Sequence, residues 1–176
     1  MKNILLGVTG SISAYKACDI ISSFSKKGYN IKVILTNGGS KFITPLALQV
    51  ISKNKVYTDI WQENDPKAIQ HIDLTKWADI FLIAPATANI IGKIANGIAD
   101  DLLSATAIVA QNNKIIAPAM NTNMYNSVAV ISNIDKLKSY GYKVIEPKEA
   151  LLACGDYGKG ALADVIDIIN FVENIK

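Results

Sequence analysis

Three side chains in this sequence have the chemistry of an enzyme site and lie in distinctive surroundings. His71 is the single histidine of the 176 residues and comes shortly before a long apolar run. Cys154 lies in a glycine-rich segment, and Asn121 stands beside two methionines, Met120 and Met124. An imidazole titrates near neutral pH, which suits acid–base work. Each residue also has a purely structural interpretation: His71 as a surface imidazole, Cys154 as a packed thiol, and the segment around Asn121 as core filling. The residue types alone leave the functional and the structural interpretation open.

The segment around which the rest of the chain is arranged covers residues 79–103. Its apolar run, Ile80–Ala84, predicts a strand that is buried on both faces, as in parallel sheets. Pro85 is expected to end this strand because it has no N–H to donate. Thr87 and Asn89 offer side-chain oxygens for capping the next helix. The small residues 86–88 are therefore expected at the carboxyl end of a central strand, where open α/β sheets bind ligands.

Alternating strand and helix patterns over residues 1–176 predict a single-domain, doubly wound, mainly parallel α/β sheet of the Rossmann-like kind. The expected strands are 3–9, 31–35, 80–84, 114–117 and 142–145. The expected helices are 11–27, 41–52, 90–110 with a break at 96–97, 128–140 and 162–175. The segment before the last helix is longer than an ordinary turn and contains three glycines around Cys154, which favours a lid. We place this flap at about 147–161.

The first strand leads into a glycine turn, Gly7–Ser13, that opens a helix. Its spacing differs from GxGxxG, so the dinucleotide fingerprint is absent. The second strand ends in Thr36 and Asn37, where a dinucleotide site usually has an acid for the ribose hydroxyls. Ser11, Ser13 and Thr36 are neutral donors that suit one terminal phosphate. A tight strand-to-helix connection without a ligand is the alternative.

Composition and charge exclude several classes of protein. A length of 176 residues fits one domain with a continuous core. The net charge of +3 is spread along the chain, so no nucleic-acid patch is predicted. Two cysteines and one histidine provide neither a disulfide framework nor a metal site. Because the chain has no signal pattern and no apolar run of roughly 18 residues, we expect a cytoplasmic protein without membrane association.

Five segments in a fixed order resemble a known family. They are a phosphate turn at Gly7–Ser13, the segment His71–Leu74, a PASANT-like Pro85–Asn89, a PxMNxxMW-like Pro118–Tyr125, and a flap-like Leu152–Gly160. On these motifs the chain is similar, over essentially all 176 residues, to the phosphopantothenoylcysteine decarboxylases of the homo-oligomeric flavin-containing cysteine decarboxylase family. Tyr125 stands where the family has tryptophan. Residues 161–164, Ala-Leu-Ala-Asp, differ from the Arg-Met-Ala-Glu of many bacterial relatives.

The resemblance implies that the chain binds FMN and that it needs no metal. The residues implied to hold FMN are Gly10, Ser11, Ile12, Thr36, Phe42, Pro85, Ala86, Thr87, Ala88, Asn89 and Ala119. The residues implied to contact the substrate are Met120, Asn121, Ala153 and Gly155. Asn121 would bind the substrate carboxylate or amide, because a neutral amide both donates and accepts hydrogen bonds. His71 would be the base that assists oxidation, and Cys154 would protonate an enethiol.

The implied reaction is the decarboxylation of 4′-phosphopantothenoylcysteine to 4′-phosphopantetheine in coenzyme A biosynthesis, through thioaldehyde and enethiol intermediates. Oxidation of the CH2–SH group gives the electrons of the departing carboxylate an acceptor, and a flavin takes up the hydride. The family also implies a homo-oligomer built from trimers. The hydrophobic share of 50% agrees with such burial, although a well-filled core explains it equally.

Three other functions remain as alternatives to the decarboxylation of 4′-phosphopantothenoylcysteine. A peptidyl-cysteine decarboxylase would use the same His71 and Asn121 on the C-terminus of a peptide, but it stops at the enethiol and needs no proton donor such as Cys154. A non-catalytic flavin-binding regulatory subunit would not need these three residues at all. A nicotinamide-dependent reductase is disfavoured by Thr36 and Asn37, because they provide no acid for the ribose.

Overall fold

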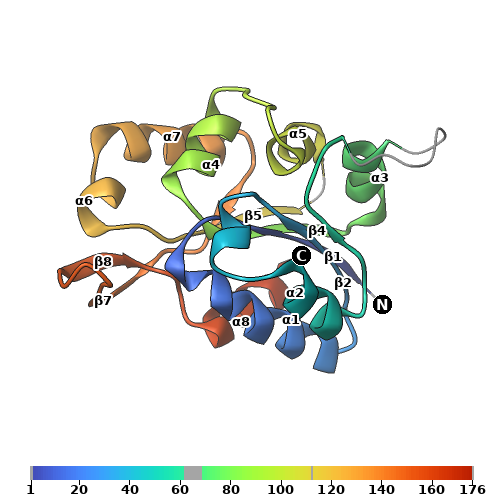
Figure 1. Cartoon of the computed structure of the whole chain (residues 1–176). Coiled ribbons are helices and arrows are strands. Elements are labelled where there is room, and N and C mark those ends of the chain that lie inside the picture. The colour runs from blue at the N-terminus through green and yellow to red at the C-terminus, as the bar shows by residue number, and fades with distance from the viewer. Residues whose placement is uncertain (1, 62–68, 112, 176) are drawn as a thin grey trace.

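The computed structural model describes residues 2–61, 69–111 and 113–175. In these residues, parallel strands form a six-stranded sheet in the order β3-β2-β1-β4-β5-β6 (Figure 1). The strands are β1 Asn3–Val8, β2 Asn30–Leu35, β3 Val56–Tyr57, β4 Ile80–Ala86, β5 Asn113–Pro118 and β6 Lys143–Val144. The chain winds outward from β1 in one direction and from β4 in the other, which makes their boundary the topological switch point. The predicted fold class is confirmed.

Helices cover both faces of the sheet (Figure 1). On one face lie α1 (Ala17–Lys26), α2 (Pro45–Ser52) and α8 (Val165–Glu173). On the other face lie α3 (Gln70–Trp77), α4 (Ala88–Ala95), α5 (Leu102–Val109) and α7 (Val128–Ser139). Three short helices follow strand ends: η1 (Ile12–Lys16) after β1, η2 (Gly39–Lys41) after β2, and α6 (Thr122–Tyr125) after β5. No helix among the described residues is both long and apolar enough to cross a bilayer.

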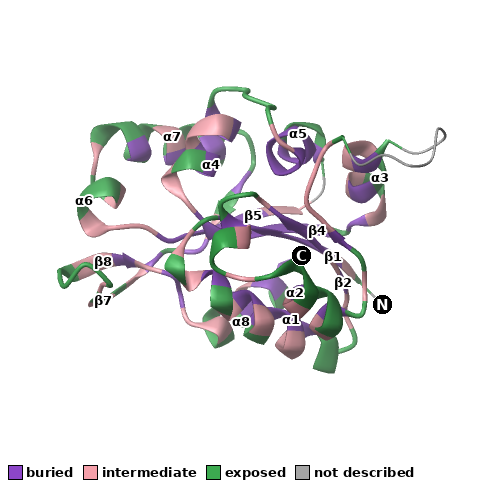
Figure 2. Cartoon of the chain, in the orientation of Figure 1, coloured by how far each residue is buried: buried purple, intermediate pink, exposed green. Residues whose placement is uncertain are grey.

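The central strands are buried on both faces, which explains their unbroken apolar sequences (Figure 2). Leu6 and Leu82 point into the cluster that packs against α1 and α8. Leu5 and Phe81, one position away on the same two strands, point into the cluster under α3, α4, α5 and α7. Successive side chains of a strand alternate between faces, so one run of apolar residues supplies both cores.

Pro85 does not end its strand, contrary to the sequence-based expectation. β4 continues to Ala86, which pairs with Pro118 of β5, and the register shifts between Ile83 and Ala86. The Ala84–Pro85 peptide bond is cis. A proline cannot donate to the ladder, but an irregular register at the strand end leaves its missing N–H without consequence. The ladder also continues past the strands, because Ala119 N donates to Ala86 O at 3.0 Å.

Two other segments differ from expectation. Residues around His71, for which no element is predicted, form α3. The flap predicted as an irregular lid at about 147–161 is an antiparallel hairpin of β7 (Lys148–Leu151) and β8 (Tyr157–Ala161). Its turn is closed by Gly155 N donating to Leu152 O at 2.9 Å and Leu152 N donating to Asp156 O at 2.8 Å. Gly155 has a φ of +89°, which favours glycine.

Candidate active site at the carboxyl edge of the sheet

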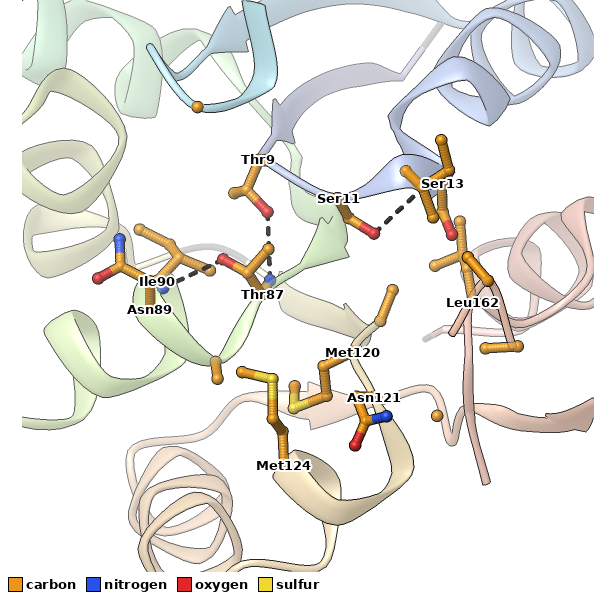
Figure 3. A pocket seen from close by; sticks show the side chains of 18 of the residues that line it. Thr9, Ser11, Ser13, Thr87, Asn89, Ile90, Met120, Asn121, Met124 and Leu162 are labelled. Carbon is orange, nitrogen blue, oxygen red and sulfur yellow. Dashed lines mark hydrogen bonds between the residues drawn. The ribbon is translucent and has the colours of Figure 1, made fainter. Parts of the chain in front are cut away.

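A cavity of about 880 Å³ opens where β1, β4 and β5 end, and its size is that of a small-molecule site (Figure 3). One end is formed by the turn after β1, the turn after β2 and the start of α4. The other end is formed by the loop after β5 and by the hairpin. The loops that follow four strands and the hairpin thus converge on one space, as the position of 86–88 predicts.

Thr9 joins the two strands at the switch point. Its Oγ1 donates to Pro85 O at 2.7 Å. The same atom accepts from Thr87 N at 3.1 Å (Figure 3). The side chain is 2% exposed, so neither bond is shared with bulk water. Thr87 then caps α4, with Oγ1 3.5 Å from Ile90 N. Thr9 is not predicted from the sequence, because a threonine at the end of an apolar strand carries no distinctive signal.

The turns after β1 and β2 approach each other closely enough to form a narrow cradle. A Cβ on Gly10 would lie 3.0 Å from the main-chain carbon of Gly38, so a larger residue would push the turns apart. Thr36 Oγ1 accepts from Gly39 N at 3.1 Å and donates to Val8 O at 3.3 Å. Ser11 caps η1 by accepting from Ser13 N at 3.2 Å.

Most of the predicted ligand residues line the cavity. The residues that do so are Gly10, Ser11, Ile12, Thr36, Thr87, Ala88, Asn89, Ala119, Met120, Asn121, Ala153 and Cys154. Pro85 and Ala86 are buried in β4 behind the wall. Phe42, 48% exposed, and Gly155 lie outside the lining. The roles assigned to all these residues stay predictions.

Asn121 and Cys154 are brought together at the cavity wall. Asn121 caps α6, its Oδ1 accepting from Asn123 N at 2.7 Å. Its Nδ2 donates to Cys154 Sγ at 3.1 Å and to Asp156 Oδ2 at 3.3 Å. The thiol in turn donates to Asp156 Oδ2 at 3.3 Å. Asp156 was not singled out from the sequence, because only the folded hairpin shows its carboxylate beside the thiol.

The base of the hairpin is fixed to the loop after β5 by hydrogen bonds to main-chain carbonyls of β8. Met120 N donates to Gly160 O at 2.9 Å, and Thr122 Oγ1 donates to Lys159 O. A Cβ on Gly160 would lie 2.3 Å from Met120 O, and one on Gly158 would lie 2.5 Å from Thr122 Oγ1. These two glycines therefore permit close approach. The sequence-based prediction of a lid rests partly on these glycines, but at both positions the structure shows close packing of the hairpin base against the loop after β5.

Three side chains connect the hairpin to α6 as a latch, which we define as Tyr125, Glu146 and Lys159. Glu146 Oε2 accepts from Tyr125 Oη and from Lys159 Nζ, both at 2.8 Å. The hydrogen bond from Lys159 holds the pKa of Glu146 below its ordinary value of 4.5. Burial and the hydrogen bond to Glu146 raise the pKa of Tyr125. Tyr125, which replaces the family's tryptophan, therefore supplies a hydroxyl donor to this network.

His71 does not lie with Asn121 and Cys154. It belongs to α3, it does not line the cavity, and in Figure 1 α3 is at the opposite end of the molecule from the hairpin. Its Nδ1 is buried and has no hydrogen-bond partner within the described part of the chain.

The chain is similar to known proteins in both sequence and fold. The Flavoprotein family model matches residues 1–175. This chain belongs to the Flavoprotein family. A relative, the probable phosphopantothenoylcysteine decarboxylase of Streptococcus mutans serotype c, is 50% identical over 174 residues, covering 98% of this chain and 97% of the relative. The coenzyme A biosynthesis bifunctional protein of Bacillus subtilis is 48% identical over 172 residues, which cover 98% of this chain but 42% of that protein.

Solved structures of this Flavoprotein family have the same fold. A cysteine-to-serine mutant of PPC decarboxylase, complexed with pantothenoylaminoethenethiol, has a TM-score of 0.91 at 32% identity, covering 98% of this chain and 96% of that one. A structure described as an FMN-binding protein has a TM-score of 0.87 at 33% identity, covering 98% and 95%. The resemblance drawn from five sequence motifs is confirmed.

The residues of the cavity fit a flavin mononucleotide better than a dinucleotide. Gly10 and Gly38 bring the main chains of the turns after β1 and β2 together at one end of the cavity. Its side chains, Ser11, Ser13 and Thr36, are neutral donors. Thr36 and Asn37 take the place of the acid that a dinucleotide's ribose requires.

Proposed function

We propose that this chain is an FMN-dependent carboxy-lyase that converts 4′-phosphopantothenoylcysteine to 4′-phosphopantetheine in coenzyme A biosynthesis. The observation that carries the proposal is the contact between Asn121 Nδ2 and Cys154 Sγ at the cavity wall, at 3.1 Å. In this proposal, Asn121 binds the substrate carboxylate and the neighbouring Cys154 thiol supplies the proton, so the contact supports joint action of the two residues. The names of similar proteins support the same assignment. They include a probable phosphopantothenoylcysteine decarboxylase, a bifunctional protein of coenzyme A biosynthesis and a PPC decarboxylase.

The chain's own residues divide the work between binding and proton transfer. FMN, bound along Gly10–Ile12, Thr36 and 87–89, would accept a hydride from the substrate and later return it. Asn121 orients the substrate carboxylate toward release as CO2. Cys154 donates its proton to the carbon that the carboxylate has left. The net reaction takes up one proton and releases one CO2, so the electrons and atoms balance without another reactant.

His71 enters this proposal from a second copy of the chain. Its position outside the cavity means that one copy cannot present it to the substrate together with Asn121. A neighbouring copy in a trimer-based homo-oligomer would place this imidazole at the cavity mouth as the base that assists oxidation. Exposed apolar side chains on α2, Leu46 and Val50 at 66% exposure each, are available for such contacts. We place the enzyme in the cytoplasm.

The purified protein tests the assignment directly. We expect flavin absorbance in the visible range and FMN as the flavin released on denaturation. We also expect 4′-phosphopantothenoylcysteine to be converted to 4′-phosphopantetheine, followed by mass spectrometry. A peptide that ends in cysteine serves as the competing substrate. Turnover of the peptide alone would assign the peptidyl-cysteine decarboxylase activity instead, and a flavin-loaded protein inert toward both would indicate a regulatory subunit.

A further inference from the structure

Asp156 has no part in the mechanism above, although its carboxylate lies where the hairpin meets Asn121. Asp156 Oδ2 is 3.3 Å from Asn121 Nδ2 and 3.3 Å from Cys154 Sγ. Asn121 Nδ2 is itself 3.1 Å from Cys154 Sγ. Three side chains therefore form a closed triangle of hydrogen bonds. Cys154 and Asn121 line the cavity, whereas Asp156 stands outside the lining and is exposed.

Every hydrogen-bonding group of the Asn121 amide is engaged in this arrangement. Its oxygen accepts from Asn123 N at 2.7 Å. Its nitrogen carries two hydrogens, and it has two acceptors, Cys154 Sγ and Asp156 Oδ2. A substrate carboxylate that is to accept from Asn121 must therefore displace one of these two acceptors.

Of the two acceptors, Asp156 is the one that matches a substrate carboxylate in chemistry. The exchange of one carboxylate for another conserves the hydrogen bond to Asn121, and two carboxylates at this distance repel each other. Once displaced, the exposed Asp156 is hydrated by solvent. Cys154 belongs to the same turn, closed by the hydrogen bond between Leu152 N and Asp156 O at 2.8 Å. A displacement of this turn that carries Asp156 away from Asn121 would therefore carry the thiol with it.

We propose that Asp156 is a positioning residue that makes the placement of Cys154 depend on the charge of the substrate. This inference rests on the proposed function. While the substrate carboxylate occupies Asn121, it holds Asp156 and the hairpin tip away. When the carboxylate leaves as neutral CO2, Asp156 returns to Asn121 and brings the thiol back. Cys154 is then in place at the step that requires its proton, and not before.

A pair of ligands that differ only in the carboxylate tests this inference in the FMN-loaded enzyme. The probes are the serine amide of 4′-phosphopantothenic acid and the matching ethanolamine amide, neither of which has a thiol to oxidise. Isothermal titration calorimetry measures both affinities in the wild type and in Asp156→Asn. We expect the variant to bind the serine derivative roughly fivefold more tightly, the scale of repulsion between unit charges about 4 Å apart in water. Its affinity for the ethanolamine derivative should be unchanged.

The control is Glu149→Gln, which removes the same charge from the same hairpin at an exposed position. Glu149 is not among the hydrogen-bond partners of Asn121 in the described part of the chain. It should leave the ratio of the two affinities at its wild-type value. If Asp156→Asn shifts both affinities alike, or weakens the serine derivative, the charge-dependent role of Asp156 is wrong. If the wild type binds neither ligand, the substrate assignment itself fails and this inference fails with it.

Discussion

The amide nitrogen of Asn121 lies 3.1 Å from the sulfur of Cys154, although the two residues are 33 positions apart in the sequence. One residue caps α6, and the other lies in the turn of the β7–β8 hairpin. The contact joins the group proposed to hold the departing carboxylate to the group proposed to replace it with a proton. The two halves of the reaction should therefore separate when one partner is changed.

Cys154→Ser should complete the first half of the reaction and stall in the second. A serine hydroxyl is far less acidic than a thiol, so it is a poor proton donor to an enethiol. On addition of 4′-phosphopantothenoylcysteine, flavin absorbance should fall once and stay low, while CO2 is released and little 4′-phosphopantetheine forms. Stopped-flow absorbance follows both phases. Full recovery of the flavin absorbance with normal product formation would remove Cys154 from the chemistry.

His71→Asn should retain flavin but lose turnover by at least roughly a hundredfold, the scale of general-base assistance. Unlike Cys154→Ser, it should leave flavin absorbance unchanged when substrate is added. If neighbouring copies share the site, coexpression of His71→Asn with Cys154→Ser should restore activity at about a quarter of the sites. At such a site one subunit supplies an intact His71 and its neighbour supplies an intact Cys154, each with a chance of about one half. Mixing the two proteins after each has assembled is the control. No recovery on coexpression would place His71 and Cys154 in the same subunit's site.

Gly160→Ala should destabilise the protein and loosen the hairpin. The new Cβ would lie 2.3 Å from Met120 O, so the hydrogen bond between Met120 N and Gly160 O must lengthen or break. We expect a loss of roughly 1–3 kcal/mol of unfolding free energy in urea titrations. Gly92→Ala is the matched control, since its Cβ would be 3.6 Å from the nearest atom, Asn133 Nδ2. In the α4 interior it should gain roughly 0.5–1 kcal/mol, and an equal loss from both variants would contradict the close-approach argument.

The latch should weaken in acid. Folding lowers the pKa of Glu146 through Lys159, so its contribution is complete above the ordinary value of 4.5 and disappears as pH falls through the lower folded value. Lys159→Met should therefore lower the free energy of unfolding at pH 7 by no more than about 1 kcal/mol, the range measured for exposed ion pairs. The difference between the variant and the wild type should shrink as pH falls below 4.5 and disappear once Glu146 is protonated in the folded protein. Lys26→Met, on the exposed side of α1, should show no such pH dependence.

Thr9→Val should reduce both stability and flavin affinity. Valine has the same shape but removes the Oγ1 that bridges Pro85 O and Thr87 N, leaving buried groups without partners, at a cost of about 1–3 kcal/mol. The start of α4 should then shift at the cavity wall. Thr106→Val is a control, because Thr106 is equally buried, donates to Leu102 O and does not line the cavity. Flavin affinity, measured by fluorescence, should fall for Thr9→Val only.

The apolar run of β4 and the small residues after it predicted the sheet and the position of the cavity, because burial on both faces and ligand binding at strand ends follow from local composition. The register shift at Pro85 and the hairpin around Gly155 could not be predicted, since both depend on strand partners. Thr9 and Asp156 were missed for the same reason. Their hydrogen bonds are made to groups that only folding brings near.

The place where α8 ends determines where a further domain could be joined to this fold. α8 begins directly after the hairpin and ends near Glu173, which pairs with Lys27 at 3.0 Å, beyond the end of α1 that is remote from the cavity. A polypeptide attached after this helix would start near the amino edge of the sheet. The loops that line the cavity are at the opposite, carboxyl edge. A domain joined at this point would therefore leave the cavity unobstructed. The Bacillus subtilis relative, of which this chain covers 42%, is a bifunctional protein longer than this fold alone.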